Sequence, residues 1–196
     1  MAKENQTVMD PPPPVPRKRC CFIDGNVGYF YPFSSKLRSV ISGGADYQLS
    51  VTYQVMKHLG VFVSGDFFIQ TGESTGSDSD CKLWILPVSL GVRGTYDFWA
   101  SRDKSHLVMG YASLAPRWYF VEARNYVSYL DKNDFANGFG GMGGLGMAYL
   151  YKYLTVNVIL QASFGNVHTH TSIPYVATPN TQVGGLVAGG GIGVNF

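Results

Sequence analysis

Charged residues are scarce in this chain of 196 residues. Asp, Glu, Lys and Arg together make up 14% of it, about half of the share in an ordinary soluble domain. The 15 basic residues nearly balance the 13 acidic ones, and the body of the chain has no dense basic stripe, so we expect no nucleic-acid partner. The basic cluster Arg17, Lys18 and Arg19 follows the proline run PPPPVP. Residues 1–21 are therefore predicted to form a flexible, polyproline-like tail.

Long apolar runs are also missing, although 45% of the residues are hydrophobic. No run approaches the ~18 consecutive apolar residues that a membrane-spanning helix needs, so the apolar residues must lie in short segments. The 24 glycines and the 14% of aromatic residues favour strands joined by turns. The opening MAKENQTVMD lacks the apolar core of a secretory signal, so we expect the mature form if the protein is exported.

Cysteine is rare, with Cys20, Cys21 and Cys81 as its three occurrences. Adjacent cysteines do not readily bridge each other, and an odd number leaves at least one thiol unpaired. The spacing fits no zinc site. We expect neither a metal nor a cofactor, and the cysteines indicate no particular function.

Alternation of apolar and polar residues is the dominant pattern from Phe22 onward. The segment from Tyr47 to Val55 is the clearest, with Tyr, Leu and Val at odd positions and Gln, Ser and Thr at even ones. A period of two predicts strands whose two faces differ in chemistry. Eight such segments recur, at residues 22–33, 47–55, 60–71, 83–98, 106–123, 138–151, 153–164 and 184–196.

The connections between these segments alternate in length. Those at 57–60, 99–106 and 152–153 are short, whereas the others are long and rich in Ser, Thr, Asn, Asp and Gly. Short turns at one end and long loops at the other are typical of an outer-membrane barrel. An even number of strands places both chain ends, with the tail, on the short-turn (periplasmic) side. The long loops are predicted at 34–46, 72–82, 124–137 and 165–183.

Charge placement indicates which face of the strands points inward. Asp24, Asp66, Arg93 and Arg117 lie mid-strand among the polar positions, which otherwise hold mainly Gln, Ser, Thr, Asn and Gly. A water-facing surface would carry more Lys and Glu, so this face suits a narrow interior. Buried charges need partners, and we hypothesise an ion pair between Asp66 and Arg93 that Arg117 and Asp24 extend. The alternative is that these residues are solvated near the rims.

The apolar positions carry Leu, Val and Ile in mid-strand and aromatic residues toward the strand ends. Two aromatic belts around an apolar band mark the outer face of a membrane barrel. The belt residues are Tyr31, Tyr47, Tyr96, Phe98, Trp118, Phe120, Tyr149, Tyr151 and Phe164.

Eight strands, a polar interior and a last strand ending in Ile192, Val194 and Phe196 resemble the small Gram-negative outer-membrane barrels of the OmpA transmembrane-domain, OmpX/Ail, OmpW and opacity-protein type. The segment LPVSLGVRGTYDF (86–98) resembles a strand of the opacity-like group. The resemblance implies an eight-stranded antiparallel up-and-down transmembrane β-barrel over residues 22–196, located in the outer membrane. It also implies that the three terminal residues form the signal read by the barrel-assembly machinery.

Two motifs with catalytic or ligand-binding associations favour plainer interpretations. GFGGMGG (138–144) contains a G-x-G-x-x-G spacing, but its glycines continue an alternating strand, whereas a dinucleotide loop opens a helix. His168 and His170 in HTHT have no apparent third metal ligand. The four histidines are divided between the predicted short turns and the opposite loop, so no Ser/His/acid set is apparent, and we expect no enzyme activity.

The favoured function is a monomeric structural anchor in outer-membrane lipid. Its long loops at 34–46, 124–137 and 165–183 would contact a host or envelope surface ligand, with Ile173 and Tyr175 at the tip of the largest. A narrow pore for small molecules is the first alternative, although eight strands enclose a space that side chains fill. A soluble ligand-binding barrel, with its apolar face inward, is the second.

Overall fold

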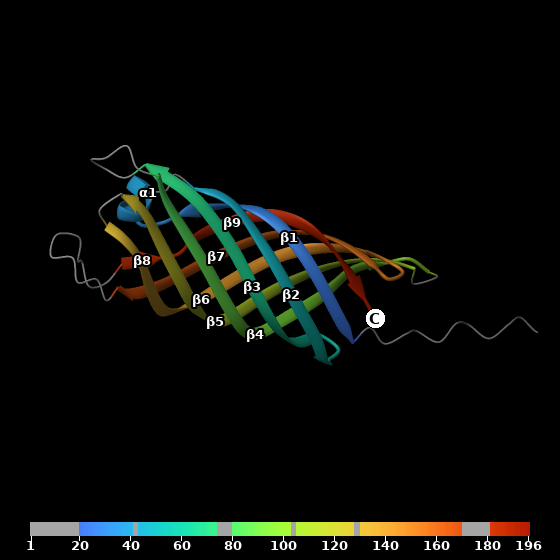
Figure 1. The fold of residues 1–196 in the computed structure, drawn as a ribbon. Coiled ribbons are helices and arrows are strands. Elements are labelled where there is room, and N and C mark those ends of the chain that lie inside the picture. The colour runs from blue at the N-terminus through green and yellow to red at the C-terminus, as the bar shows by residue number, and fades with distance from the viewer. Residues whose placement is uncertain (1–19, 41–42, 74–79, 103–104, 128–129, 170–180) are drawn as a thin grey trace, which may run out of the picture.

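The computed structural model describes residues 20–40, 43–73, 80–102, 105–127, 130–169 and 181–196. Strands dominate them (Figure 1). A six-residue helix, α1 (Ser35–Val40), follows the first strand. The strands are β1 (Cys21–Pro32), β2 (Gly44–Met56), β3 (Leu59–Glu73), β4 (Asp80–Ala100), β5 (His106–Val127), β6 (Leu130–Tyr151), β7 (Leu154–Thr169), β8 (Thr181–Val183) and β9 (Gly185–Asn195).

The strands form one closed antiparallel barrel. Each strand from β1 to β7 pairs with the next in the chain, and β9 closes the barrel by pairing with both β7 and β1. Strands β8 and β9 pair with β7 in one continuous register and are separated only by Gly184, whose φ is 142°. They are two parts of one barrel strand, so the barrel has the eight strands that the sequence predicts.

The strands are strongly tilted. Following the paired residues once around the barrel from Cys21 leads back to β1 at Tyr31, ten positions further along. A stagger of this size fixes both the tilt and the diameter of an eight-stranded barrel. Because of this stagger, residues at the same height in the lumen are not register partners on successive strands. The stagger therefore determines which residues form the ion pairs described below.

Several strands extend beyond their predicted ends. The predicted loop 124–137 is wrong in large part, because β5 continues to Val127 and β6 begins at Leu130, paired residue by residue. Strand also covers parts of the predicted loops 72–82 and 165–183, and α1 occupies part of 34–46. Backbone pairing between facing strands satisfies these polar segments just as it does apolar ones, so their composition alone did not reveal it.

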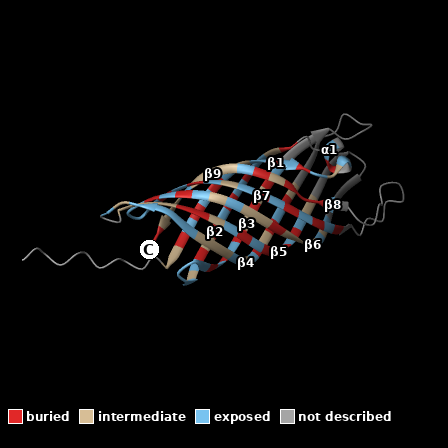
Figure 2. Ribbon diagram, turned by 180° about the vertical axis from the view of Figure 1, so that it is seen from behind, coloured by how far each residue is buried: buried red, intermediate tan, exposed pale blue. Residues whose placement is uncertain are grey.

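The alternation seen in the sequence becomes an outside and an inside. Buried and exposed positions form alternating bands around the barrel wall (Figure 2). On β2, Tyr47, Leu49 and Tyr53 are exposed, whereas Gln48 and Ser50 are buried in the lumen. The outer face is therefore apolar and the inner face polar, which is the reverse of a soluble ligand-binding barrel. None of the helices within the described residues has the length and apolar content needed to span a membrane.

Apolar clusters close the lumen at both ends, with polar residues between them. The cluster at the long-loop end includes Leu37 from α1, which lies at that end of the barrel (Figure 1). The cluster at the short-turn end centres on Leu150 and Phe22. The two ends of the barrel segment also meet there, because the Cys20 N–H donates to the carbonyl oxygen of Phe196 at 2.7 Å. Their meeting on the short-turn side follows from the even strand count.

Candidate functional site: the interior polar network

The centre of the lumen holds an ion pair between Arg117 on β5 and Asp66 on β3. An Arg117 guanidinium nitrogen lies 2.6 Å from Asp66 Oδ2, and the two side chains are 2% and 1% exposed. The guanidinium also donates to Ser89 Oγ at 2.8 Å and to Met142 Sδ at 3.2 Å. Because strand β4 separates β3 from β5, the pair ties together strands that are not neighbours in the sheet.

Side-chain amides extend this pair around the lumen. Gln48 Nε2 donates to Asp66 Oδ1 at 2.9 Å and to Gln161 Oε1 at 2.9 Å. Gln161 Nε2 lies 3.3 Å from Asp66 Oδ2, and Asn26 Nδ2 donates to Gln48 Oε1 at 3.2 Å. Asp66 therefore accepts from two amides and a guanidinium. We call these residues, with Ser89, Met142 and Arg117, the central network; it draws on every strand from β1 to β7.

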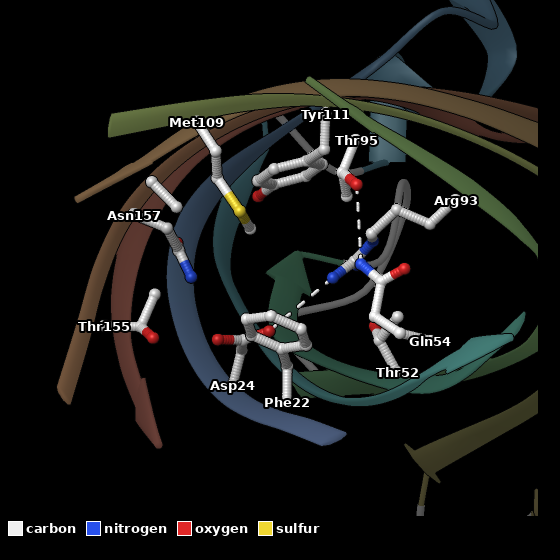
Figure 3. Close-up of a pocket in the computed structure, with 11 residues that line it drawn as sticks. Phe22, Asp24, Thr52, Gln54, Arg93, Thr95, Met109, Tyr111, Thr155 and Asn157 are labelled. Carbon is white, nitrogen blue, oxygen red and sulfur yellow. Dashed lines mark hydrogen bonds and ion pairs between the residues drawn. The ribbon is translucent and has the colours of Figure 1, made fainter. Parts of the chain in front are cut away.

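A second ion pair lies nearer the short turns. Arg93 on β4 points across the lumen to Asp24 on β1 (Figure 3), with 3.6 Å between guanidinium nitrogen and Oδ2. The guanidinium carbon lies 5.1 Å from the centre of the Phe62 ring and 4.7 Å from that of Tyr111. Arg93 is therefore held both by a carboxylate and by two aromatic faces.

The hypothesis that Asp66 pairs with Arg93 is wrong. Arg93 lies opposite Gly60 on β3, six residues before Asp66, which corresponds to about 20 Å along a strand. The tilt instead brings Arg93 level with Asp24, and Arg117 level with Asp66. All four residues face the interior rather than the rims, but they form two separate pairs.

Glycines on β9 make room for the polar side chains of β1. A Cβ on Gly191 would run into the Gly25 carbonyl oxygen and Asn26 Oδ1, and one on Gly193 would run into Asp24 Oδ1. At these positions β9 contributes no side chain to the lumen. The inner face of β9 is therefore kept free of side chains where the polar residues of β1 need the space.

The lumen leaves little free space around the two ion pairs. A cavity of about 10 Å³ lies beside Asp24 and Arg93, and one of about 20 Å³ lies between Asp66 and the apolar cluster at the long-loop end. Such volumes admit about one water molecule each. Side chains therefore fill the barrel, as the strand number predicts.

Asp46 is a buried charged residue that the sequence analysis did not single out. It is 4% exposed and, together with Asp66 and Arg117, lines the cavity of about 20 Å³ beside the apolar cluster at the long-loop end. Its position as the first polar residue of the alternating β2 segment was the available signal, but it fell within the predicted loop 34–46. The alternation predicts Gln at inward-facing positions, but it does not reveal that Gln48 and Gln161 are partners of Asp66.

The other motifs hold no assembled site among the described residues. Gly138, Gly140 and Gly143 all lie within β6, and a Cβ on Gly140 would meet the backbone of Phe164 on β7. His168 lies in β7 opposite Asn137, and His170 lies outside the described residues. In the described part of the chain, no three His, Cys, Asp or Glu residues come together as a metal site would require.

The predicted outward-facing residues occupy the outer face. Tyr31, Tyr47, Trp118, Phe120 and Phe164 lie toward the long-loop end; Tyr96, Phe98, Tyr149 and Tyr151 lie toward the short turns, and all nine are exposed. Of the terminal residues, Ile192 and Phe196 are exposed and Val194 is half-buried. Their role as an assembly signal stays a prediction.

Comparison with known proteins finds similarity in fold but not in sequence. The sequence matches no model of a known protein family, and no curated protein is detectably similar to it. The outer membrane protein OprG from Pseudomonas aeruginosa superposes with a TM-score of 0.56 at 14% identity, over 91% of this chain and 96% of OprG. Neisserial surface protein A gives a TM-score of 0.51 at 16% identity, over 90% and 97%. The chain therefore has the fold of the small outer-membrane barrels: eight antiparallel strands closed around a polar interior, with an apolar face outside.

Proposed function

We propose that this protein is a closed outer-membrane anchor that acts through surface interactions at its long-loop end. The observation that carries the proposal is the filled lumen, in which two ion pairs and the amides around them bridge the barrel between two apolar clusters. A barrel built this way is rigid and does not conduct. Its free surfaces are the lipid-facing wall and the two ends, and the long loops provide the larger end.

The long-loop end also has a structured base on which variable segments can be presented. Strands β5 and β6 remain paired up to Val127 and Leu130. Beside β1, Arg38 of α1 donates to the Tyr31 hydroxyl at 3.0 Å. We propose that the segments 34–46 and 165–183, together with the end of the β5–β6 hairpin within 124–137, contact a host or envelope surface ligand from this base, and that the barrel acts as a monomer.

Planar-bilayer recording of the purified protein tests whether the barrel is closed. We expect no steady single-channel conductance from the unmodified protein. A stable, ion-selective conductance would contradict the anchor and support the narrow-pore alternative instead.

Deleting or scrambling one loop segment in cells tests the surface role. Deleting residues 170–180 should reduce attachment of cells to host-cell or matrix surfaces, while the amount of folded barrel stays the same. The matched control keeps the length and composition of 170–180 but scrambles the order, and it should lose attachment as well if the sequence of the segment matters. Full attachment by the deletion variant would contradict a role for this loop.

A further inference from the structure

The short-turn end of the barrel carries an excess of positive charge. Its described residues include Lys57, Arg102 and Lys152 in the turns against the exposed Asp97 near the end of β4. In an outer-membrane barrel this end faces the leaflet on the periplasmic side. Cations at a membrane surface attract anionic lipid headgroups. Basic residues that lie next to the aromatic belt are therefore candidates for contact with such headgroups.

One of these cations belongs to a compact cluster on the outer wall. Tyr151 lies between His106, whose ring centre is 4.8 Å away, and Lys152, whose Nζ is 5.3 Å from the ring centre. His106 Nδ1 is hydrogen-bonded to the Tyr149 hydroxyl at 2.6 Å. This bond fixes the imidazole against the wall and leaves Nε2 as the nitrogen it does not use. We call His106, Tyr149, Tyr151 and Lys152 the rim cluster.

The register places the rim cluster on the lipid side, at the edge of the apolar band. His106 is paired with Tyr151, and the adjacent pair Leu107–Leu150 points inward, where Leu150 is fully buried. His106 and Tyr151 therefore face outward. Tyr149 lies two residues closer to mid-strand, within the aromatic belt, while Lys152 follows the end of β6. Together they reach from the belt toward the headgroup region.

The backbone holds Lys152 in a conformation that lysine adopts at a cost. Its φ is 53°, the one positive value at a non-glycine residue among those described. Glycine or asparagine would fit this turn more easily. The Lys152 N–H donates to the Ser105 carbonyl oxygen at 3.0 Å, and this bond joins the turn to the one between β4 and β5. The turn thus fixes the start of the lysine side chain beside Tyr151.

We propose that the rim cluster is a binding site for the headgroup of an anionic phospholipid. The donors to the phosphodiester are the Lys152 ammonium and, in the tautomer whose Nδ1 accepts from the Tyr149 hydroxyl, the His106 Nε2–H. Tyr149 and Tyr151 form the aromatic wall along which the lipid lies at the interface. This inference rests on the proposed membrane location, but it adds a site at one place on the rim that selects by headgroup charge.

Trp99 provides a reporter beside the site. It is exposed on the outer wall and pairs with Val108, which in turn pairs with Tyr149. The chain has three tryptophans, so Trp84→Phe together with Trp118→Phe leaves Trp99 alone. In vesicles of phosphatidylcholine and phosphatidylglycerol, quenching of Trp99 by brominated phosphatidylglycerol is compared with quenching by brominated phosphatidylcholine at equal fractions. We expect a headgroup preference of about fivefold.

Lys152→Gly removes the cation while relieving the backbone, so this variant should fold at least as well as its parent. It should lower the preference for phosphatidylglycerol close to one. The control Lys57→Gln removes the same charge from the turn between β2 and β3 and should leave the preference unchanged. Equal quenching by both lipids in the parent would overturn the proposed binding site. An equal loss of the phosphatidylglycerol preference in Lys152→Gly and Lys57→Gln would overturn it as well. Absence of quenching by either lipid would instead overturn the membrane location itself.

Discussion

Among single residues, the two lumen arginines meet different surroundings. Arg117 and Asp66 lie at 2.6 Å and are almost fully buried, and their other hydrogen bonds go to protein groups. Arg93 and Asp24 lie at 3.6 Å and are somewhat more exposed, and the arginine also rests on Phe62 and Tyr111. Removing one member of a fully buried pair leaves an uncompensated charge, which is the costlier change.

We therefore expect Arg117→Met to lower the free energy of unfolding by about 3–5 kcal/mol. Arg93→Met should lower it by about 1–2 kcal/mol, because the Arg93–Asp24 pair is longer and less buried than Arg117–Asp66 and methionine replaces part of the aromatic contacts. Urea titration of the barrel refolded in lipid vesicles, followed by tryptophan fluorescence, measures both changes.

The double variant Arg117→Met with Asp66→Asn is the control for the charge. It should recover much of the loss, because it leaves no unpaired charge in the lumen. A larger loss for Arg93→Met than for Arg117→Met, or no recovery in the double variant, would contradict the assignment of the two pairs.

The inward position of all four charged residues could be predicted from the sequence, but their pairing could not. Alternation places Asp24, Asp66, Arg93 and Arg117 on one face because side chains repeat every two residues. Pairing across the lumen depends on the stagger of the closed barrel, which only the complete register shows. Asp46 was missed for a related reason, since a strand that begins within a polar segment looks like a loop.

On the level of strands and turns, β9 closes the barrel with glycine on its inner face. A Cβ on Gly191 would collide with the neighbouring backbone and with Asn26, whereas one on Gly65 of β3 would meet no atom within 4 Å. We expect Gly191→Ala to lower the free energy of unfolding by about 1–3 kcal/mol through overpacking. Gly65→Ala is the matched control and should have little effect. Equal effects in the vesicle urea titration would show that β9 does not need its glycines.

The end of β9 carries a second prediction, which concerns assembly in the cell. Phe196 and Phe164 are both exposed aromatic residues, 60% and 63% respectively, but only Phe196 belongs to the proposed assembly signal. If the terminal residues are the assembly signal, Phe196→Ala should lower the amount of folded protein in the outer membrane severalfold, whereas Phe164→Ala should not. Both variants should lose similar stability in refolded vesicles. Equal yields of the two variants in outer-membrane fractions would argue against the signal.

For the molecule as a whole, the apolar outer face should respond to charge according to depth. Leu160 and Leu154 both point outward from β7, but Leu160 lies mid-strand and Leu154 is the first residue after the turn. Leu160→Arg should cost about 2–4 kcal/mol in vesicles and Leu154→Arg about 0–1 kcal/mol. Urea titration compares them directly. Equal costs would mean that the two positions do not differ in membrane depth.

The strand number, the two faces and the side on which the barrel begins and ends could be predicted from the sequence, because alternation and loop length encode them directly. Strand ends on the long-loop side could not. Segment 124–137 is polar enough to resemble a loop, yet Asn125 pairs with Lys132 and Asn133 with Arg124. Beyond the membrane-facing apolar band, a hairpin is held by hydrogen bonds between its two backbones. Its sequence therefore does not need the apolar alternation by which a strand is recognised.

The central claim, a barrel with an apolar outside and a filled polar lumen, is tested most directly by detergent dependence combined with gel mobility. We expect the protein to stay in solution only with detergent or lipid. Without boiling it should migrate as a compact form, and after boiling it should shift to the mobility of its 21.4 kDa chain. A monodisperse, folded monomer in buffer without detergent would contradict the account.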